Sequence, residues 1–114
     1  MNTGAMKGRK PISVCLDGEE VPCATWRGIF EKSLKECNKI PEKHNELMRL
    51  RNQYYGRKRL LLADSKNELR SPLEIDKDLY VETHYDTQTL MNLLLRIFTY
   101  IGYDYKSMRV TVRA

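Results

Sequence analysis

The chain has 114 residues, of which 41% are hydrophobic and 31% are charged, and its formal net charge is +5. A chain of this length normally forms one hydrophobic core, which excludes a two-domain enzyme. Its densest apolar segment, Leu90 to Ile101, is interrupted by polar side chains and is shorter than the ~20 apolar residues that cross a bilayer. We therefore expect a soluble protein that has no membrane partner.

The first residues are small and uncharged, and a second methionine, Met6, follows them. We expect residues 1–8 to be a disordered leader or an artificial extension, and residues 9–114 to form a single domain. The three cysteines are an odd number spread over the first third of the chain, which does not suit a disulfide framework, and no signal peptide is recognisable. We therefore expect a cytoplasmic protein.

The first predicted elements are a β-hairpin and a helix. Apolar residues alternate with others over Ile12–Leu16, Asp17-Gly18 supplies a turn that can adopt positive φ, and Val21 resumes an extended run. The apolar period then changes to that of an amphipathic helix over Thr25–Asn38, with Thr25 as the N-cap.

A second helix and two strands are predicted in the middle of the chain. The helix begins at Pro41, which suits a first helical turn, and is expected to run to about Asn52. Leu60–Ala63 is a short apolar run typical of a buried strand. Ser71-Pro72 is expected to break regular structure, and Leu79–Thr83 is rich in β-formers.

The last helix is the clearest element. It begins at Asp86 or Thr87, either of which can cap it, and ends before Gly102, which suits a left-handed residue. Alternating residues around Val110 and Val112 then predict a final strand. Together the elements predict an α+β domain of order ββααββαβ, with a mostly antiparallel sheet and helices packed on one face.

The last helix is apolar over more than half of its circumference, because Met91 and Leu95 lie beside the main stripe. One sheet face does not cover that much surface. Either the segment from Thr25 to Asn52 covers the remainder or a second chain does, and we favour a homodimer through this helix.

Positive charge is concentrated between Arg49 and Arg59, a stretch with five cations, two tyrosines and no acidic residue. Guanidinium groups bind phosphate bidentately, and tyrosines stack on unpaired bases or donate to phosphate. The stretch therefore predicts contact with nucleic acid. The alternative is a solvated helix end, with Arg49 and Arg51 favoured by the helix dipole and Tyr54 continuing the apolar face.

Catalytic and metal-binding patterns are weak. His44 and His84 are the only histidines, and no nucleophile accompanies either at a recognisable spacing. The three cysteines, Cys15, Cys23 and Cys37, could join His44 on one zinc ion, but no C-x-x-C pair is present and burial of the thiols is the more ordinary reading.

A metal-dependent nuclease is a further hypothesis. Such an enzyme needs two or three carboxylates and a lysine near the ends of adjacent strands. The chain offers Asp64, Lys66, Glu74, Asp76 and Glu82. The short acidic-x-lysine pattern also arises by chance in a highly charged chain.

From Pro11 onward, the chain resembles a small module associated with bacterial restriction and related defence proteins. The residues that carry the resemblance are Trp26, Gly56-Arg57-Lys58-Arg59, Arg70-Ser71-Pro72 with Glu74-Ile75, Tyr80-Val81-Glu82-Thr83 and Gly102-Tyr103-Asp104. His84 stands where similar sequences often have asparagine. The resemblance implies an accessory role in bacterial DNA processing, alone or beside a larger nuclease, and implies no reaction.

Independently of the resemblance, the carboxylate of Glu82 can orient Arg57 or Arg59 through an ion pair, and such a pair would fix the basic loop for phosphate contact. We expect a non-catalytic module that binds nucleic acid, specifically DNA, without metal or cofactor. A protein-interaction or dimerisation module is the alternative, and the nuclease comes third. The expected binding residues are Arg49, Arg51, Tyr54, Tyr55, Arg57, Lys58, Arg59, Arg109 and Arg113.

Overall fold

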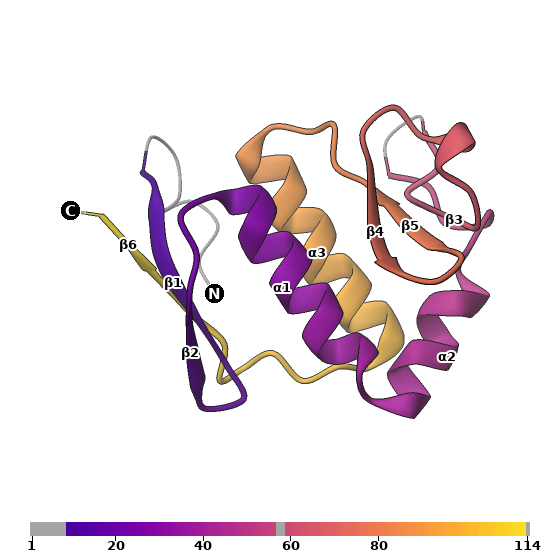
Figure 1. Cartoon of the computed structure of the whole chain (residues 1–114). Coiled ribbons are helices and arrows are strands. Elements are labelled where there is room, and N and C mark those ends of the chain that lie inside the picture. The colour runs from indigo at the N-terminus through magenta and orange to yellow at the C-terminus, as the bar shows by residue number, and fades with distance from the viewer. Residues whose placement is uncertain (1–8, 57–58, 114) are drawn as a thin grey trace. The chain divides into compact units, whose positions relative to one another are not determined.

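The computed structural model describes residues 9–56 and 59–113, so the predicted leader, residues 1–8, lies outside the described residues. Figure 1 shows the order of helices and strands along the chain. The described residues form two compact units, one made of residues 9–33 with 85–113 and the other of residues 34–56 with 59–84. The expectation of one domain over residues 9–114 stays a prediction. In the part of the chain that is described, no helix is long and apolar enough to span a membrane.

The first unit contains a three-stranded antiparallel sheet of order β2-β1-β6 (Figure 1). Its strands are β1 (Pro11–Leu16), β2 (Glu19–Pro22) and β6 (Arg109–Val112). The turn between β1 and β2 confirms the predicted hairpin, because Asp17 and Gly18 have φ values of 51° and 80°. The final strand pairs with β1, a long-range pairing that local patterns did not specify.

Helices α1 and α3 begin where their capping residues predict, and α3 also ends at its predicted capping residue. In α1 (Trp26–Asn38), the Thr25 hydroxyl accepts the Gly28 N–H at 3.0 Å. Before α3 (Thr87–Ile101), the Asp86 carboxylate accepts the Thr89 N–H at 2.7 Å. Gly102 follows α3 in the left-handed conformation, with φ 75°. The backbone donors and acceptors at these ends are thereby satisfied locally.

The apolar surface of α3 is largely covered within the chain itself. Met91 and Phe98 have no exposed surface, and Leu95 is half-buried. The Phe98 ring packs against Tyr103, with centroids 4.8 Å apart, and against Tyr105, with centroids 5.9 Å apart. The exposed strip that motivated the homodimer is therefore mostly absent from this helix, and dimerisation stays a prediction without that support.

Substituting Met91 by glutamate tests this arrangement. We expect Met91→Glu to lower the free energy of unfolding by more than about 3 kcal/mol, because it buries an unpaired charge. The matched change Leu95→Glu, on the half-buried side of the same helix, should cost about 1 kcal/mol. Urea titrations measure both variants. If both stay fully stable while sedimentation shows a wild-type dimer separating into single chains, these side chains belong to an interface instead.

The second unit contains α2 (Pro41–Arg49), a 3-10 turn (Lys66–Glu68) and a second antiparallel sheet of order β3-β5-β4. Its strands are β3 (Leu62–Ala63), β4 (Pro72–Asp76) and β5 (Leu79–Glu82). The α+β class and the antiparallel pairing are confirmed. The strands form two sheets, whereas a single sheet was expected. The observed order is ββααβββαβ, which contains one strand more than the predicted order because β4 was not predicted.

The strand β4 begins at the proline that was expected to break regular structure. It is an edge strand, where a residue without an N–H is tolerated. Leu73 and Ile75 are buried while Glu74 and Asp76 are exposed, which is the alternation of a sheet with one covered face. The prediction that Ser71-Pro72 breaks regular structure is therefore wrong at Pro72, where β4 begins.

Candidate functional site

The basic stretch folds as the end of α2 followed by an irregular hairpin. Helix α2 ends at Arg49, earlier than predicted, because Asn52 adopts a left-handed conformation with φ 62° that a helix cannot contain. We call residues 52–62 the basic hairpin. It is closed by Asn52 N–H to Leu62 O at 2.8 Å, Leu61 N–H to Tyr54 O at 2.8 Å, Gly56 N–H to Arg59 O at 2.9 Å, and a bridge between Tyr55 and Leu60.

The predicted binding residues of this stretch differ in exposure. Tyr55 is 56% exposed, and the side chains of Arg49 and Arg59 are 76% and 44% exposed. Tyr54 is half-buried. Arg57 and Lys58 lie outside the described residues. Arg49, Tyr55 and Arg59 are thus the described side chains of the prediction that are available to a partner.

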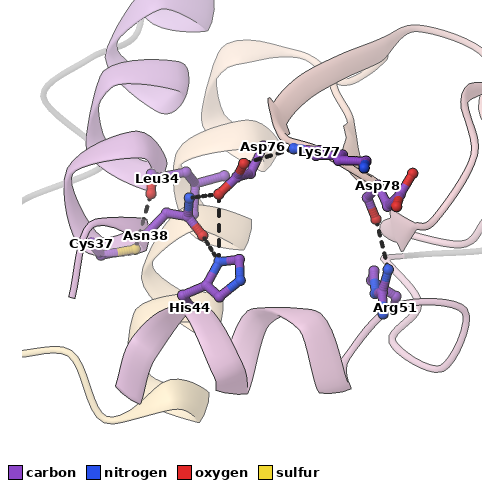
Figure 2. A network of polar contacts seen from close by, with 8 residues as sticks. All are labelled: Leu34, Cys37, Asn38, His44, Arg51, Asp76, Lys77 and Asp78. Carbon is purple, nitrogen blue, oxygen red and sulfur yellow. Dashed lines mark hydrogen bonds and ion pairs between the residues drawn. The ribbon is translucent and has the colours of Figure 1, made fainter. Parts of the chain in front are cut away.

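Arg51 has a structural role. Its Nε donates to Met48 O and its Nη1 donates to Asp78 O, both at 2.9 Å, so it links the end of α2 to the turn between β4 and β5 (Figure 2). Two of its five N–H groups are used in these bonds, and the guanidinium plane is held by them. These two hydrogen bonds therefore fix the position of the Arg51 charge at the end of α2.

An open polar depression of about 400 Å³ lies at the end of α2. It is lined by Met48, Arg49, Arg51, Asn52, Gln53 and Asp64. The Asn52 side-chain oxygen accepts the Asp64 N–H at 3.3 Å, which brings two distant parts of the chain together. Sequence reasoning did not predict Asn52 and Gln53 as site residues, and placed Asp64 in a metal site. The only local signal was an asparagine just beyond a helix end, where left-handed backbone is tolerated.

The carboxylates of the nuclease hypothesis are engaged separately. Glu74 accepts from the Tyr80 hydroxyl at 3.1 Å, Asp76 accepts from Asn38 at 2.8 Å, and Glu82 is buried. Among the described residues, no three histidine, cysteine, aspartate or glutamate side chains gather as metal ligands. The structure therefore does not assemble the proposed set.

The cysteines do not form the proposed zinc site either. Cys15, Cys23, Cys37 and His44 all lie in the described part of the chain, and no three of them gather there as metal ligands. Cys37 is fully buried and donates to Leu34 O at 3.2 Å (Figure 2). Burial raises the pKa of its thiol to about 12, so Cys37 is a protonated, unreactive side chain at neutral pH.

Glu82 organises the backbone beside the basic hairpin. Its buried carboxylate accepts four backbone N–H groups: Arg70 at 2.8 Å, Ser71 at 2.7 Å, Thr83 at 3.0 Å and His84 at 3.2 Å. Arg59 Nη1 lies 3.9 Å from Glu82 Oε1, which confirms the predicted ion pair for Arg59. The pair links the buried anion to the turn end of the hairpin, where Arg59 is paired with Gly56.

The protonation equilibrium of Glu82 depends on two opposing effects. Burial raises the pKa of this carboxyl group, but the four backbone donors outweigh burial and hold the pKa below its ordinary value. The unfolded chain therefore takes up the proton more readily than the folded chain does. The stabilisation is complete above the ordinary glutamate pKa of about 4.3 and is lost as the pH falls through the lower folded value.

We expect Glu82→Gln to lower the free energy of unfolding by about 2 kcal/mol at pH 7, because the amide NH₂ faces donors that need an acceptor. The difference from the wild type should begin to shrink as the pH falls below about 4.3, the ordinary glutamate pKa, and should go on shrinking as the pH falls through the lower folded value. Urea titrations between pH 3 and pH 7 measure this. Glu74→Gln, an exposed change in the neighbouring strand, should have little effect. Equal stability of Glu82→Gln and the wild type at pH 7 would contradict the role given to Glu82.

A second polar network connects the end of α1, the start of α2 and β4 (Figure 2). The Asn38 amide donates to Asp76 Oδ2 at 2.8 Å, and its oxygen lies 2.8 Å from His44 Nδ1. Because the carboxylate only accepts, the amide oxygen must face His44, and Nδ1 is the protonated ring nitrogen. The pKa of Asp76 is lowered by the Asn38 hydrogen bond and then by the Lys77 N–H. His84, the other histidine, is exposed.

The two remaining predicted binding residues belong to the first unit. Arg109 is exposed, and its Nη1 donates to Lys106 O at 2.7 Å and Met108 O at 2.9 Å. Arg113 is exposed, and its backbone N–H donates to Lys10 O at 2.9 Å. Their contact with nucleic acid stays a prediction.

No protein-family model matches the chain, and neither a curated protein nor a solved structure matches it significantly. The resemblance to modules of bacterial restriction and defence proteins therefore stays a hypothesis from sequence, together with the bacterial and cytoplasmic setting.

Proposed function

We propose that this chain is a non-catalytic module that binds nucleic acid through the end of α2 and the basic hairpin. The proposal depends on one observation: a stretch with five cations and no acidic residue carries three exposed side chains, Arg49, Tyr55 and Arg59. Such a surface attracts a polyanion along its length.

The three exposed side chains supply complementary chemistry. The guanidinium groups of Arg49 and Arg59 can each form two parallel hydrogen bonds to phosphate oxygens. The ring of Tyr55 can stack on a base or donate its hydroxyl to the backbone of the polymer. Arg49 pairs with Glu46 at 3.1 Å, but an exposed pair of this kind contributes little and exchanges readily for phosphate.

The fold reduces the ordering that binding would otherwise require. Backbone hydrogen bonds close the hairpin at Gly56 and Arg59, and the Glu82 carboxylate lies beside the Arg59 guanidinium. A binding loop whose backbone is already held loses less conformational entropy when a partner arrives. The identity of the polymer as DNA, and a larger nuclease as protein partner, follow from the sequence resemblance and form part of the proposal.

A salt titration tests the proposal. We expect the logarithm of the affinity for duplex or single-stranded DNA to fall linearly with the logarithm of the salt concentration, with roughly −0.7 to −0.9 in slope for each phosphate neutralised. Replacing Arg57, Lys58 and Arg59 together by alanine should reduce the steepness of this slope by about two to three. Fluorescence anisotropy at several salt concentrations measures the slope.

The matched control removes the same charge elsewhere, by replacing the exposed residues Lys32, Lys66 and Lys106 with alanine. This variant should keep nearly the wild-type slope. Circular dichroism and urea titration establish that both triple variants are folded. Equal slopes for the wild type and the folded hairpin variant would exclude the basic hairpin as the contact surface.

A further inference from the structure

The depression at the end of α2 has a mixed lining that a phosphate group alone does not explain. Arg49 and Arg51 contribute positive charge, but Asp64 contributes a carboxylate and Gln53 contributes an amide. Among the described residues, neither the Asp64 carboxylate nor the Gln53 side chain has a hydrogen bond or ion pair. A free phosphate would be repelled by Asp64 and would leave its acceptor oxygens unused.

An occupant that satisfies this lining must carry negative charge, hydrogen-bond acceptors and N–H donors together. A nucleotide does so, because its phosphate is an anion and its base edge carries acceptors and donors side by side. The volume of about 400 Å³ falls within the range of small-molecule pockets and admits a single base with its sugar. A paired base keeps at most one exocyclic N–H free, so only an unpaired base can offer two N–H donors of its Watson–Crick edge to Asp64.

We infer that the depression binds one unpaired nucleotide of a single strand and that it favours guanine. This inference rests on the proposed function and names the ligand of the same surface. Guanine has two adjacent N–H donors, at N1 and N2, that match the two oxygens of a carboxylate. Adenine and cytosine offer one amino group, and thymine and uracil offer one imide N–H. Guanine also has the acceptors O6 and N7, which suit arginine and glutamine donors.

The backbone geometry supports a fixed arrangement for this recognition. Two backbone carbonyls hold the Arg51 guanidinium, which keeps three N–H groups outside those bonds. The bond from Asp64 N–H to the Asn52 side chain holds the start of the Asp64 loop at the end of α2. Tyr55, close in sequence and 56% exposed, can stack on a neighbouring base without preference for its identity.

The experiment measures binding of fluorescein-labelled DNA strands of equal length by anisotropy. The strands are all thymine, thymine with one central guanine, thymine with one central adenine or cytosine, and the guanine strand annealed to its complement. We expect the guanine strand to bind at least about fivefold more tightly than each of the other single strands, and more tightly than its duplex.

Two variants that make the same chemical change separate recognition from charge. Asp64→Asn removes the carboxylate at the depression, and Asp17→Asn makes the same change in the β1–β2 turn, where asparagine also tolerates the positive φ. Asp17→Asn should strengthen binding of every strand slightly by removing negative charge, and Asp64→Asn should do so only for the strands that lack guanine. Asp64→Asn should reduce the guanine preference to less than about twofold, whereas Asp17→Asn should retain it in full.

The outcomes distinguish this inference from the proposed function. Salt-dependent binding of all strands with no guanine preference, or a preference that survives Asp64→Asn, would overturn the inference and leave the proposed function in place. Equal binding of the guanine strand and its duplex would do the same. Failure to bind any strand at 50 mM salt would overturn both.

Discussion

The buried carboxylate of Glu82 is the interaction on which the second unit depends most. It collects backbone donors from the segment before β4 and from the residues that follow β5, and it lies beside Arg59 of the basic hairpin. A buried anion is costly unless hydrogen bonds replace its water shell. Because four backbone N–H groups do so here, the carboxylate holds the backbone at Arg70 and Ser71, and it also lies beside Arg59 at the turn end of the hairpin.

Some residues of the basic stretch have structural roles, and others are exposed and available to a partner. The guanidinium group of Arg51 donates to two backbone carbonyl groups, and Tyr54 is half-buried. These two residues agree with the alternative interpretation, in which the stretch is a structural helix end. Arg49, Tyr55 and Arg59 remain exposed. The committed residues hold the end of α2 and the hairpin in place, and the exposed ones give the surface its chemistry. The proposed binding depends on exposed members of this eleven-residue stretch, and one of them, Arg59, also pairs with Glu82.

The acidic residues also divide into those that hold the structure and one that lines the depression. Glu82 and Asp76 accept hydrogen bonds that hold loops and helix ends, and Glu74 accepts from Tyr80. Asp64 alone among the carboxylates of the nuclease hypothesis lines the depression. Asp64 shares this lining with Arg49 and Arg51, so a ligand there meets both a carboxylate and guanidinium groups. We propose that this combination of charges adds a preference among bases to the proposed attraction for a polyanion.

The sequence by itself determined the elements whose signals are local. The β1–β2 turn, the start of α1 and both ends of α3 follow from the positions of Asp17, Thr25, Asp86 and Gly102, because turns and caps depend on residues within a few positions. Tertiary structure alone decided that Pro72 begins an edge strand, that β6 pairs with β1, and that Asp64 joins Arg51 around one depression. These features depend on contacts between residues far apart in the chain, which hydrophobic periodicity and residue spacing do not encode.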